Sequence, residues 1–147
     1  MKTTAIAAAF AATLTAAAPA SAAEWVPLST NSDETMLYSG KEGSQKFVKI
    51  GPDDAITLIV RIDKKGTKTP KFYRFGIKAK ACKEGAGSLH VYDLNDEPLD
   101  NPDYVSEGGT VASQLGDTLC ELARLEIAER QQKAQPKSAS TRNANEI

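Results

Sequence analysis

Cysteine and histidine, the residues most used for metal sites and nucleophilic catalysis, are scarce in this sequence. Its 147 residues include two Cys and one His, which cannot supply the four ligands of a Cys/His zinc site. No G-x-S-x-G, H-E-x-x-H or phosphate-binding glycine loop occurs in the chain. We therefore expect no metal, no cofactor and no enzymatic activity.

The sequence also lacks an excess of charge of one sign and a long apolar run. Lys and Arg total 18 and Asp and Glu total 19, a formal net charge of −1, whereas nucleic-acid binding proteins are clearly basic. No apolar run reaches the roughly 18 residues of a membrane-spanning helix. We expect no nucleic-acid partner and no membrane span. The length and the 41% of hydrophobic residues predict one globular domain.

Residues 1–22 show, in order, the features of a bacterial export signal. Lys2 supplies the positive start, an alanine-rich apolar stretch follows, and Ala20-Ser21-Ala22 provides the small residues that a signal peptidase reads. The alternative is an alanine-rich amphipathic helix that stays on the protein. The pattern predicts cleavage after Ala22 and a mature protein that is periplasmic, extracellular or at the cell surface.

Export determines how the two cysteines are interpreted. Cys82 and Cys120 allow a single intramolecular pairing, and disulfides persist in oxidising compartments. The alternative is two buried thiols. We expect a Cys82–Cys120 disulfide, and on the chain-entropy model a bridge over this separation stabilises the fold by about 3–4 kcal/mol.

Short alternating segments between turn-forming residues predict an antiparallel sheet. In residues 56–63 every second residue is Ile, Leu or Val, which is typical of a strand with one buried face. Residues 72–82 alternate as well, but their pattern sets Cys82 on the face opposite Ala81, so a bulge is needed to bring Cys82 to the helix. The six predicted strands cover residues 25–28, 35–38, 46–50, 56–63, 72–82 and 88–92.

One helix is predicted after the sheet. Thr110 is a good N-cap, and apolar residues recur at helical spacing from Val111 to Leu122. Gly116 is a weak point that costs about 1 kcal/mol relative to Ala. The helix is expected to run to residue 132. Residues 133–147 contain too few large apolar side chains to order themselves, which predicts a disordered tail.

The fold class that follows is α+β. We expect a small antiparallel sheet of about five or six strands, with one C-terminal helix packed on it and one disulfide, in a single domain of residues 23–132. The order of aromatic residues, turns and cysteines supports a family assignment. That order runs through Trp25-Val26-Pro27, Tyr38, residues 56–62, Tyr73 to Cys82, Leu89-x-x-Tyr92-Asp93, Gly109-Thr110 and Cys120.

Between Trp25 and Cys120 this order resembles the surface-adhesin protein E family. The resemblance implies an antiparallel sheet with a C-terminal helix tied to it by a disulfide. It also implies an outer-surface protein that binds host matrix or serum proteins, and a homodimer. The signal lacks the cysteine of a lipoprotein anchor, and Asp93-Leu94-Asn95-Asp96 lacks the glycine of the family's Asp-x-x-Gly turn. No binding residue is carried over from the family.

Basic residues are concentrated in the centre of the chain. Residues 61–83 hold nine Lys or Arg and one acid. Arg74, Lys78 and Lys80 are predicted to line one exposed strand face, and Lys64, Lys65 and Lys68 extend that set. Such a patch suits an acidic protein, a heparin-like sugar or an anionic envelope surface. The alternative is a solvated face, or one neutralised by the acidic segment that follows it.

Acidic residues are concentrated in a predicted irregular loop, residues 93–109. Residues 93–107 contain six acids and no base. A calcium loop is disfavoured, because Pro98 stands where glycine is needed and Tyr104 where a bidentate Glu is needed. Insertion into a partner's cleft fits a loop of this length better. The candidate contact residues are Asp96, Glu97, Asp100, Asp103 and Tyr104.

These observations leave three hypotheses for function. The first is an exported, non-enzymatic protein-binding module that resembles surface-adhesin protein E and binds a host or envelope protein. The second is a periplasmic inhibitor or immunity protein that blocks an enzyme through residues 93–109. The third is a small envelope-stability factor without a tight ligand. A homodimer through edge-strand pairing is compatible with each of them.

Overall fold

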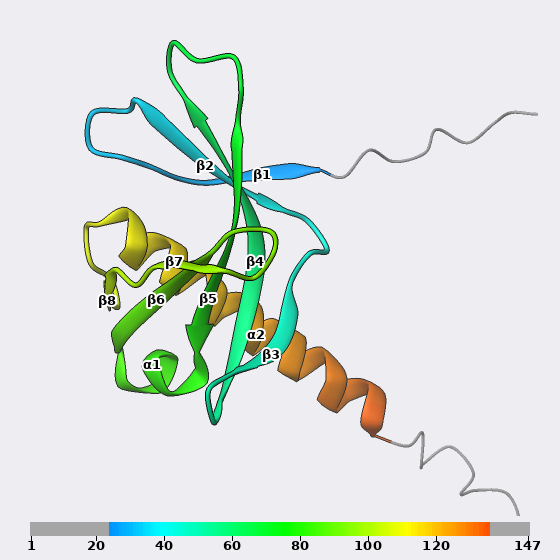
Figure 1. Cartoon of the computed structure of the whole chain (residues 1–147). Helices are drawn as coiled ribbons and strands as arrows, with labels where there is room; N and C mark the ends of the chain where they lie inside the picture. Colours follow the sequence, from blue (N-terminus) through cyan, green and yellow to red (C-terminus); the bar gives the residue numbers. More distant parts are fainter. Residues whose placement is uncertain (1–23, 136–147) are drawn as a thin grey trace, which may run out of the picture.

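The computed structural model describes residues 24–135, which form one antiparallel sheet and two helices (Figure 1). The sheet runs in the order β1-β2-β4-β5-β6-β7, while β3 pairs with β4 and β8 pairs with β6. This confirms the predicted fold class. The elements are β1 Trp25–Thr30, β2 Met36–Lys41, β3 Lys46–Ile50, β4 Asp53–Lys64, β5 Lys71–Lys78, α1 Ala79–Glu84, β6 Ala86–Tyr92, β7 Pro98–Asp100, β8 Asp103–Val105 and α2 Val111–Ala134.

The long strand β4 organises the sheet. Its second half pairs with β2, with Met36 opposite Lys64, and its first half pairs with β3, with Lys46 opposite Thr57. The strands β2 and β3 therefore share one edge of β4, and β5 occupies the other edge along eight residue pairs. The predicted buried face of residues 56–63 is confirmed, because Ile56, Leu58 and Val60 are all in the core, although Thr57 on the other face is buried as well.

The prediction that a strand continues to Cys82 is wrong. Strand β5 ends at Lys78, and the chain turns into the short helix α1, which carries Cys82 and ends at Gly85 with φ 71°. Glycine adopts this left-handed conformation without a steric clash because it has no Cβ, and the conformation ends the helix. Because helical geometry re-aims the Cys82 side chain, no bulge is needed for it to reach α2.

The prediction of an irregular loop over residues 93–109 is also wrong. Two three-residue strands in this segment extend the sheet: β7 pairs with β6 through Asp100 and Val91, and β8 pairs with β6 through Val105 and Ala86. Pro98 opens β7, a position that proline tolerates because it is the first residue of an edge strand. Residues 93–109 are called the acidic segment below.

Helix α2 begins where the sequence predicts and covers one face of the sheet. Thr110 Oγ1 accepts a hydrogen bond of 3.1 Å from the Ser113 N–H, which confirms the N-cap. Leu115 and Leu119 are buried against Ile77 and the other core residues. At 1.5 Å per residue, the 24-residue helix is about 36 Å long. Figure 1 shows it crossing behind the sheet from β8 to beyond β3.

Helix α2 extends slightly beyond its predicted end. Helix α2 runs to Ala134, so the first residues of the predicted disordered tail are helical. The remainder of that tail, from residue 136, and the predicted signal at residues 1–22 lie outside the described residues. Within residues 24–135, no helix has the length and apolar character required to cross a membrane.

Candidate functional site

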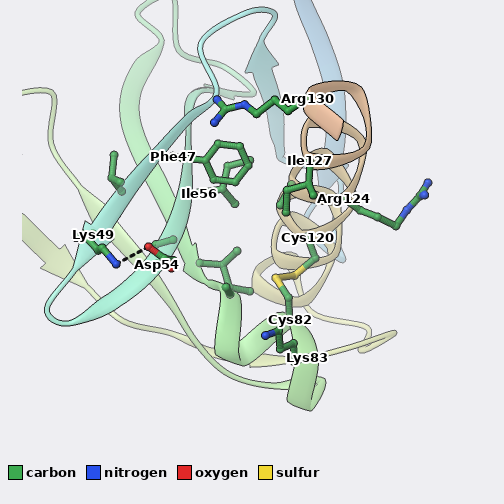
Figure 2. Close-up of a pocket in the computed structure, with 15 residues that line it drawn as sticks. Phe47, Lys49, Asp54, Ile56, Cys82, Lys83, Cys120, Arg124, Ile127 and Arg130 are labelled. Atoms are coloured by element: carbon green, nitrogen blue, oxygen red, sulfur yellow. Dashed lines mark ion pairs between the residues drawn. A yellow bond between two sulfur atoms is a disulfide. The ribbon is translucent and has the colours of Figure 1, made fainter. Parts of the chain in front are cut away.

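A groove of about 700 Å³ lies between β3, α1 and the C-terminal half of α2 (Figure 2). We call it the β3–α2 groove. Its walls are mainly apolar: Phe47 comes from β3, Ile56 from β4 and Ile127 from α2. The groove is partly open to solvent. Its size and lining are those of a binding site rather than of a packing defect, which is usually far smaller.

The disulfide closes one end of this groove. Cys82 on α1 and Cys120 on α2 are bonded, with their Cα atoms 5.6 Å apart, as predicted from the cysteine count. Both sulfur-bearing residues line the groove. The bond fixes α2 against the end of the sheet that carries α1, and it thereby sets the distance between the walls.

The periodicity of α2 explains why this part of the helix presents an apolar wall. Cys120, Ala123 and Ile127 fall three and four residues apart and share one side of the helix. The buried residues of α2 end at Leu119, so the helix extends beyond the surface that the sheet can cover. Ile127 is 48% exposed, and Phe47 on the opposite wall is 37% exposed. Two large apolar side chains therefore face solvent across the groove.

Leu125 provides an internal comparison for this wall. It is 49% exposed, almost the same as Ile127, and lies on the same helix. It is not among the residues that line the groove, because a separation of two residues places it on a different side of the helix. Exposure alone therefore does not distinguish the groove from the rest of α2.

Cationic side chains surround the apolar walls. The guanidinium of Arg130 lies 4.7 Å from the centre of the Phe47 ring, a cation–π contact. Lys49 Nζ forms an ion pair of 2.6 Å with Asp54 Oδ1. Lys83 lies beside the disulfide in Figure 2, and no ion pair involves it among residues 24–135.

A fourth cation, Arg124, lines the groove but points outward in Figure 2. It forms an ion pair of 2.5 Å with Glu121, and this pairing raises the pKa of Arg124 and lowers the pKa of Glu121. Both groups are fully exposed, so the pair contributes little to stability. Four cations thus line the groove, and Asp54 is its one acidic lining residue.

The structure disperses the basic residues that were predicted to share one strand face. Arg74 and Lys78 lie on β5, whereas Lys80 lies on α1. Arg74 forms an ion pair with Asp96 of the acidic segment, and Lys78 Nζ lies 3.0 Å from Asp53 Oδ2. Lys80 pairs at 3.8 Å with the glutamate one turn later. Only the Arg74–Asp96 pair is the neutralisation by the acidic segment given above as the alternative, because Asp53 and Glu84 lie outside that segment.

The acidic segment keeps most of its predicted contact residues at the surface. Glu97, Asp100 and Asp103 are exposed and form no ion pair among the described residues. Leu94 and Leu99 beside them are 49% and 52% exposed. Neither leucine was among the predicted contact residues, although large aliphatic residues in a highly acidic segment are a recognisable signal of a contact surface.

Tyr104 is a correction, because its side chain is only 2% exposed and cannot contact a partner. Its ring packs against Gly116, and its hydroxyl donates a hydrogen bond of 2.8 Å to Asp117 Oδ1. Burial, together with the Asp117 carboxylate, raises the pKa of Tyr104. Tyr104 therefore anchors β8 to α2.

The described residues contain no cluster of three or more His, Cys, Asp or Glu side chains that could bind a metal ion. His90, the single histidine, lies half-buried on β6 opposite Gly76. Comparison with protein-family models, curated proteins and solved structures finds no match to this chain. The resemblance to the surface-adhesin protein E family therefore stays a prediction from the sequence.

Proposed function

We propose that this protein is an exported, non-enzymatic protein-binding module, and that the β3–α2 groove is the surface that binds the partner protein. The observation that carries the proposal is the presence of Phe47 and Ile127, exposed on opposite walls of one apolar groove. Monomeric proteins rarely leave such contiguous apolar surface uncovered unless it binds something.

The shape of the groove supports a protein segment as the ligand. Small molecules are bound in sites that bury most of their surface, whereas this groove is partly open to solvent. An open apolar groove that borders a helix suits the apolar face of an amphipathic segment. The disulfide keeps the walls in place before binding, which lowers the ordering cost of association.

Site-specific crosslinking in the native compartment tests the proposal. A photoreactive amino acid is placed at Phe47, Ile127 or Leu125 in separate variants. We expect crosslinks to a common partner protein at the first two positions and none at Leu125, which has matched exposure but lies outside the groove. An Ile127→Asp change should abolish the Phe47 crosslink. Equal crosslinking at all three positions, or none, contradicts the proposal.

Export has its own test. We expect the mature protein to begin at Ala23, since the predicted signal ends at Ala22. The intact mass of protein purified from its native compartment reports the first residue directly. A mass that includes residues 1–22 contradicts export by cleavage.

A second candidate function is inhibition of an enzyme by the acidic segment. It is favoured by Leu94 and Leu99, which are exposed among unpaired acids at the edge of the sheet. In that case Leu99→Asp should abolish capture of the enzyme, whereas Ile127→Asp should leave capture unchanged. The reverse pattern favours the groove.

A further inference from the structure

Two surfaces of complementary character lie on opposite sides of the central strands β4 and β5. The acidic segment contains six acids and no base between residues 93 and 107, and it exposes Leu94, Leu99 and Val105 by 49 to 55%. The β3–α2 groove is apolar and has four cations in its lining, of which Lys49, Arg124 and Arg130 form ion pairs within the molecule and Lys83 forms none among residues 24–135. In Figure 1, β7 and β8 lie on the left of the molecule, whereas β3 and the end of α2 lie at the lower right.

The two surfaces of one molecule cannot meet each other. Strands β7 and β8 are held in the ladder of β6, and three strand spacings, through β5 and β4, separate β6 from β3. At about 4.8 Å per spacing, this distance is roughly 14 Å within the sheet. Any contact between the acidic segment and the groove must therefore join two molecules.

We propose that the acidic segment of one copy docks into the β3–α2 groove of a second copy. The inference rests on the proposed function, in that it takes the groove to be a protein-binding site and names its occupant. Leu94 and Leu99 supply the apolar side chains for the walls formed by Phe47 and Ile127. The unpaired acids Glu97, Asp100 and Asp103 then approach the cations around the groove, Lys83 above all.

The geometry of this contact determines the assembly. The two contacting surfaces are different, so the contact is heterologous rather than two-fold, and an open chain of any length leaves one groove and one acidic segment unoccupied at its ends. The molecules therefore associate head to tail, into open chains or a closed ring. In a symmetric dimer, by contrast, both copies bury the same surface against each other, and no copy of that surface is left to bind a third molecule.

Sedimentation velocity of the oxidised mature protein, over a range of concentrations, tests the proposal. We expect the mean mass to rise with concentration and to fall at high salt, because the acids and cations attract each other less when screened. Ile127→Asp places a charge on the wall of the groove, and Leu99→Asp removes an apolar side chain from the acidic segment. Each variant alone should weaken self-association by more than tenfold. Leu125→Asp, the matched control, should behave as the unchanged protein does.

The mixture of the two variants gives the sharpest result. The Leu99→Asp protein still has a groove, and the Ile127→Asp protein still has an acidic segment. Their equimolar mixture should form a 1:1 dimer and nothing larger. In that dimer the unoccupied groove carries Ile127→Asp and the unoccupied acidic segment carries Leu99→Asp, so neither can bind a further copy. A charge-reversed pair, Asp100→Lys and Lys83→Glu, repeats the test if an apolar-to-acid variant fails to fold, as judged by circular dichroism.

Other outcomes overturn the inference in distinguishable ways. A protein that stays monomeric at every concentration, or a dimer that survives both single variants, contradicts head-to-tail docking. If crosslinks at Ile127 then lead to a different protein, the groove is still a protein-binding site and the proposed function stands. If crosslinks at Ile127 lead to nothing, both proposals fail.

Discussion

Gly116 lies in the buried part of α2, where the ring of Tyr104 crosses the helix. A Cβ atom at this position would overlap that ring, so Gly116→Ala forces Tyr104 and β8 outward. We expect the free energy of unfolding to fall by about 1–3 kcal/mol, as for other overpacked cores, despite the gain of about 1 kcal/mol in helix propensity. Urea denaturation of the purified protein measures the change.

The sign of the change in the free energy of unfolding shows whether the overlap with the Tyr104 ring or the higher helix propensity of alanine dominates. In a Tyr104→Ala background the ring is gone, and the same Gly116→Ala change should stabilise the protein by about 1 kcal/mol. If Gly116→Ala stabilises the protein with Tyr104 in place, the close approach of ring and helix is not present in solution.

The Tyr104 hydroxyl links stability to alkaline pH. Burial and the neighbouring Asp117 raise its pKa above the usual value of 10.0, so the folded state holds this proton more tightly than the unfolded state. The resulting stability is fully present below about pH 10 and is lost as the pH rises through the folded pKa. Tyr104→Phe should reduce this alkaline loss, and should cost about 1 kcal/mol at neutral pH.

Chemical denaturation between pH 8 and pH 11 measures both effects. Part of the alkaline loss should persist in the variant, because burial also raises the pKa of Tyr38. Tyr38→Phe is therefore the matched control, and the two changes should add. An alkaline profile that Tyr104→Phe leaves unaltered contradicts the raised pKa.

At the scale of whole elements, the start of α2 depends on a single cap. Thr110 Oγ1 accepts from the Ser113 N–H at 3.1 Å, and Thr110→Ala removes this acceptor. We expect a loss of about 1 kcal/mol in the free energy of unfolding, measured by urea denaturation. Thr110→Ser keeps the hydroxyl and should stay close to the unchanged protein. Equal losses in both variants would mean that the cap contributes nothing.

The regular elements could be predicted because each has a buried side with a simple period. Every second residue of β4 from Ile56 to Ile62 belongs to or packs against the core, and Leu115 and Leu119 repeat at the helical interval on α2. The cysteine count, taken together with the predicted export signal, was enough to pair Cys82 with Cys120. These inferences need only local patterns and one chemical rule.

The errors have equally local causes. Residues 78–81 read Lys-Ala-Lys-Ala, a pattern that alternates like a strand, yet a six-residue helix accommodates it as well. Strands β7 and β8 have three residues each, too few to show a period. Phe47 and Ile127 lie 80 positions apart in the sequence, so the groove between them exists only after α2 has packed across the sheet.

For the whole molecule, the Cys82–Cys120 bond is the covalent link between the helix and the end of the sheet. It closes a separation of 38 residues, which restricts the unfolded chain and stabilises the fold by about 3–4 kcal/mol on the chain-entropy model. We expect reduction of the protein to lower its free energy of unfolding by that amount. Denaturation with and without a reductant measures the difference, and a Cys82→Ala/Cys120→Ala variant should match the reduced protein.

The same bond should also control binding, because it closes one end of the β3–α2 groove. The fully buried residues of α2 end at Leu119, and beyond it Leu122 and Ala123 are only partly buried against the core, so the disulfide contributes to holding Ile127 at a fixed distance from Phe47. Reduction should therefore weaken crosslinking at Phe47 and Ile127 under conditions in which circular dichroism still shows a folded sheet. If crosslinking is unchanged in the reduced but folded protein, packing alone sets the width of the groove and the bond serves stability only.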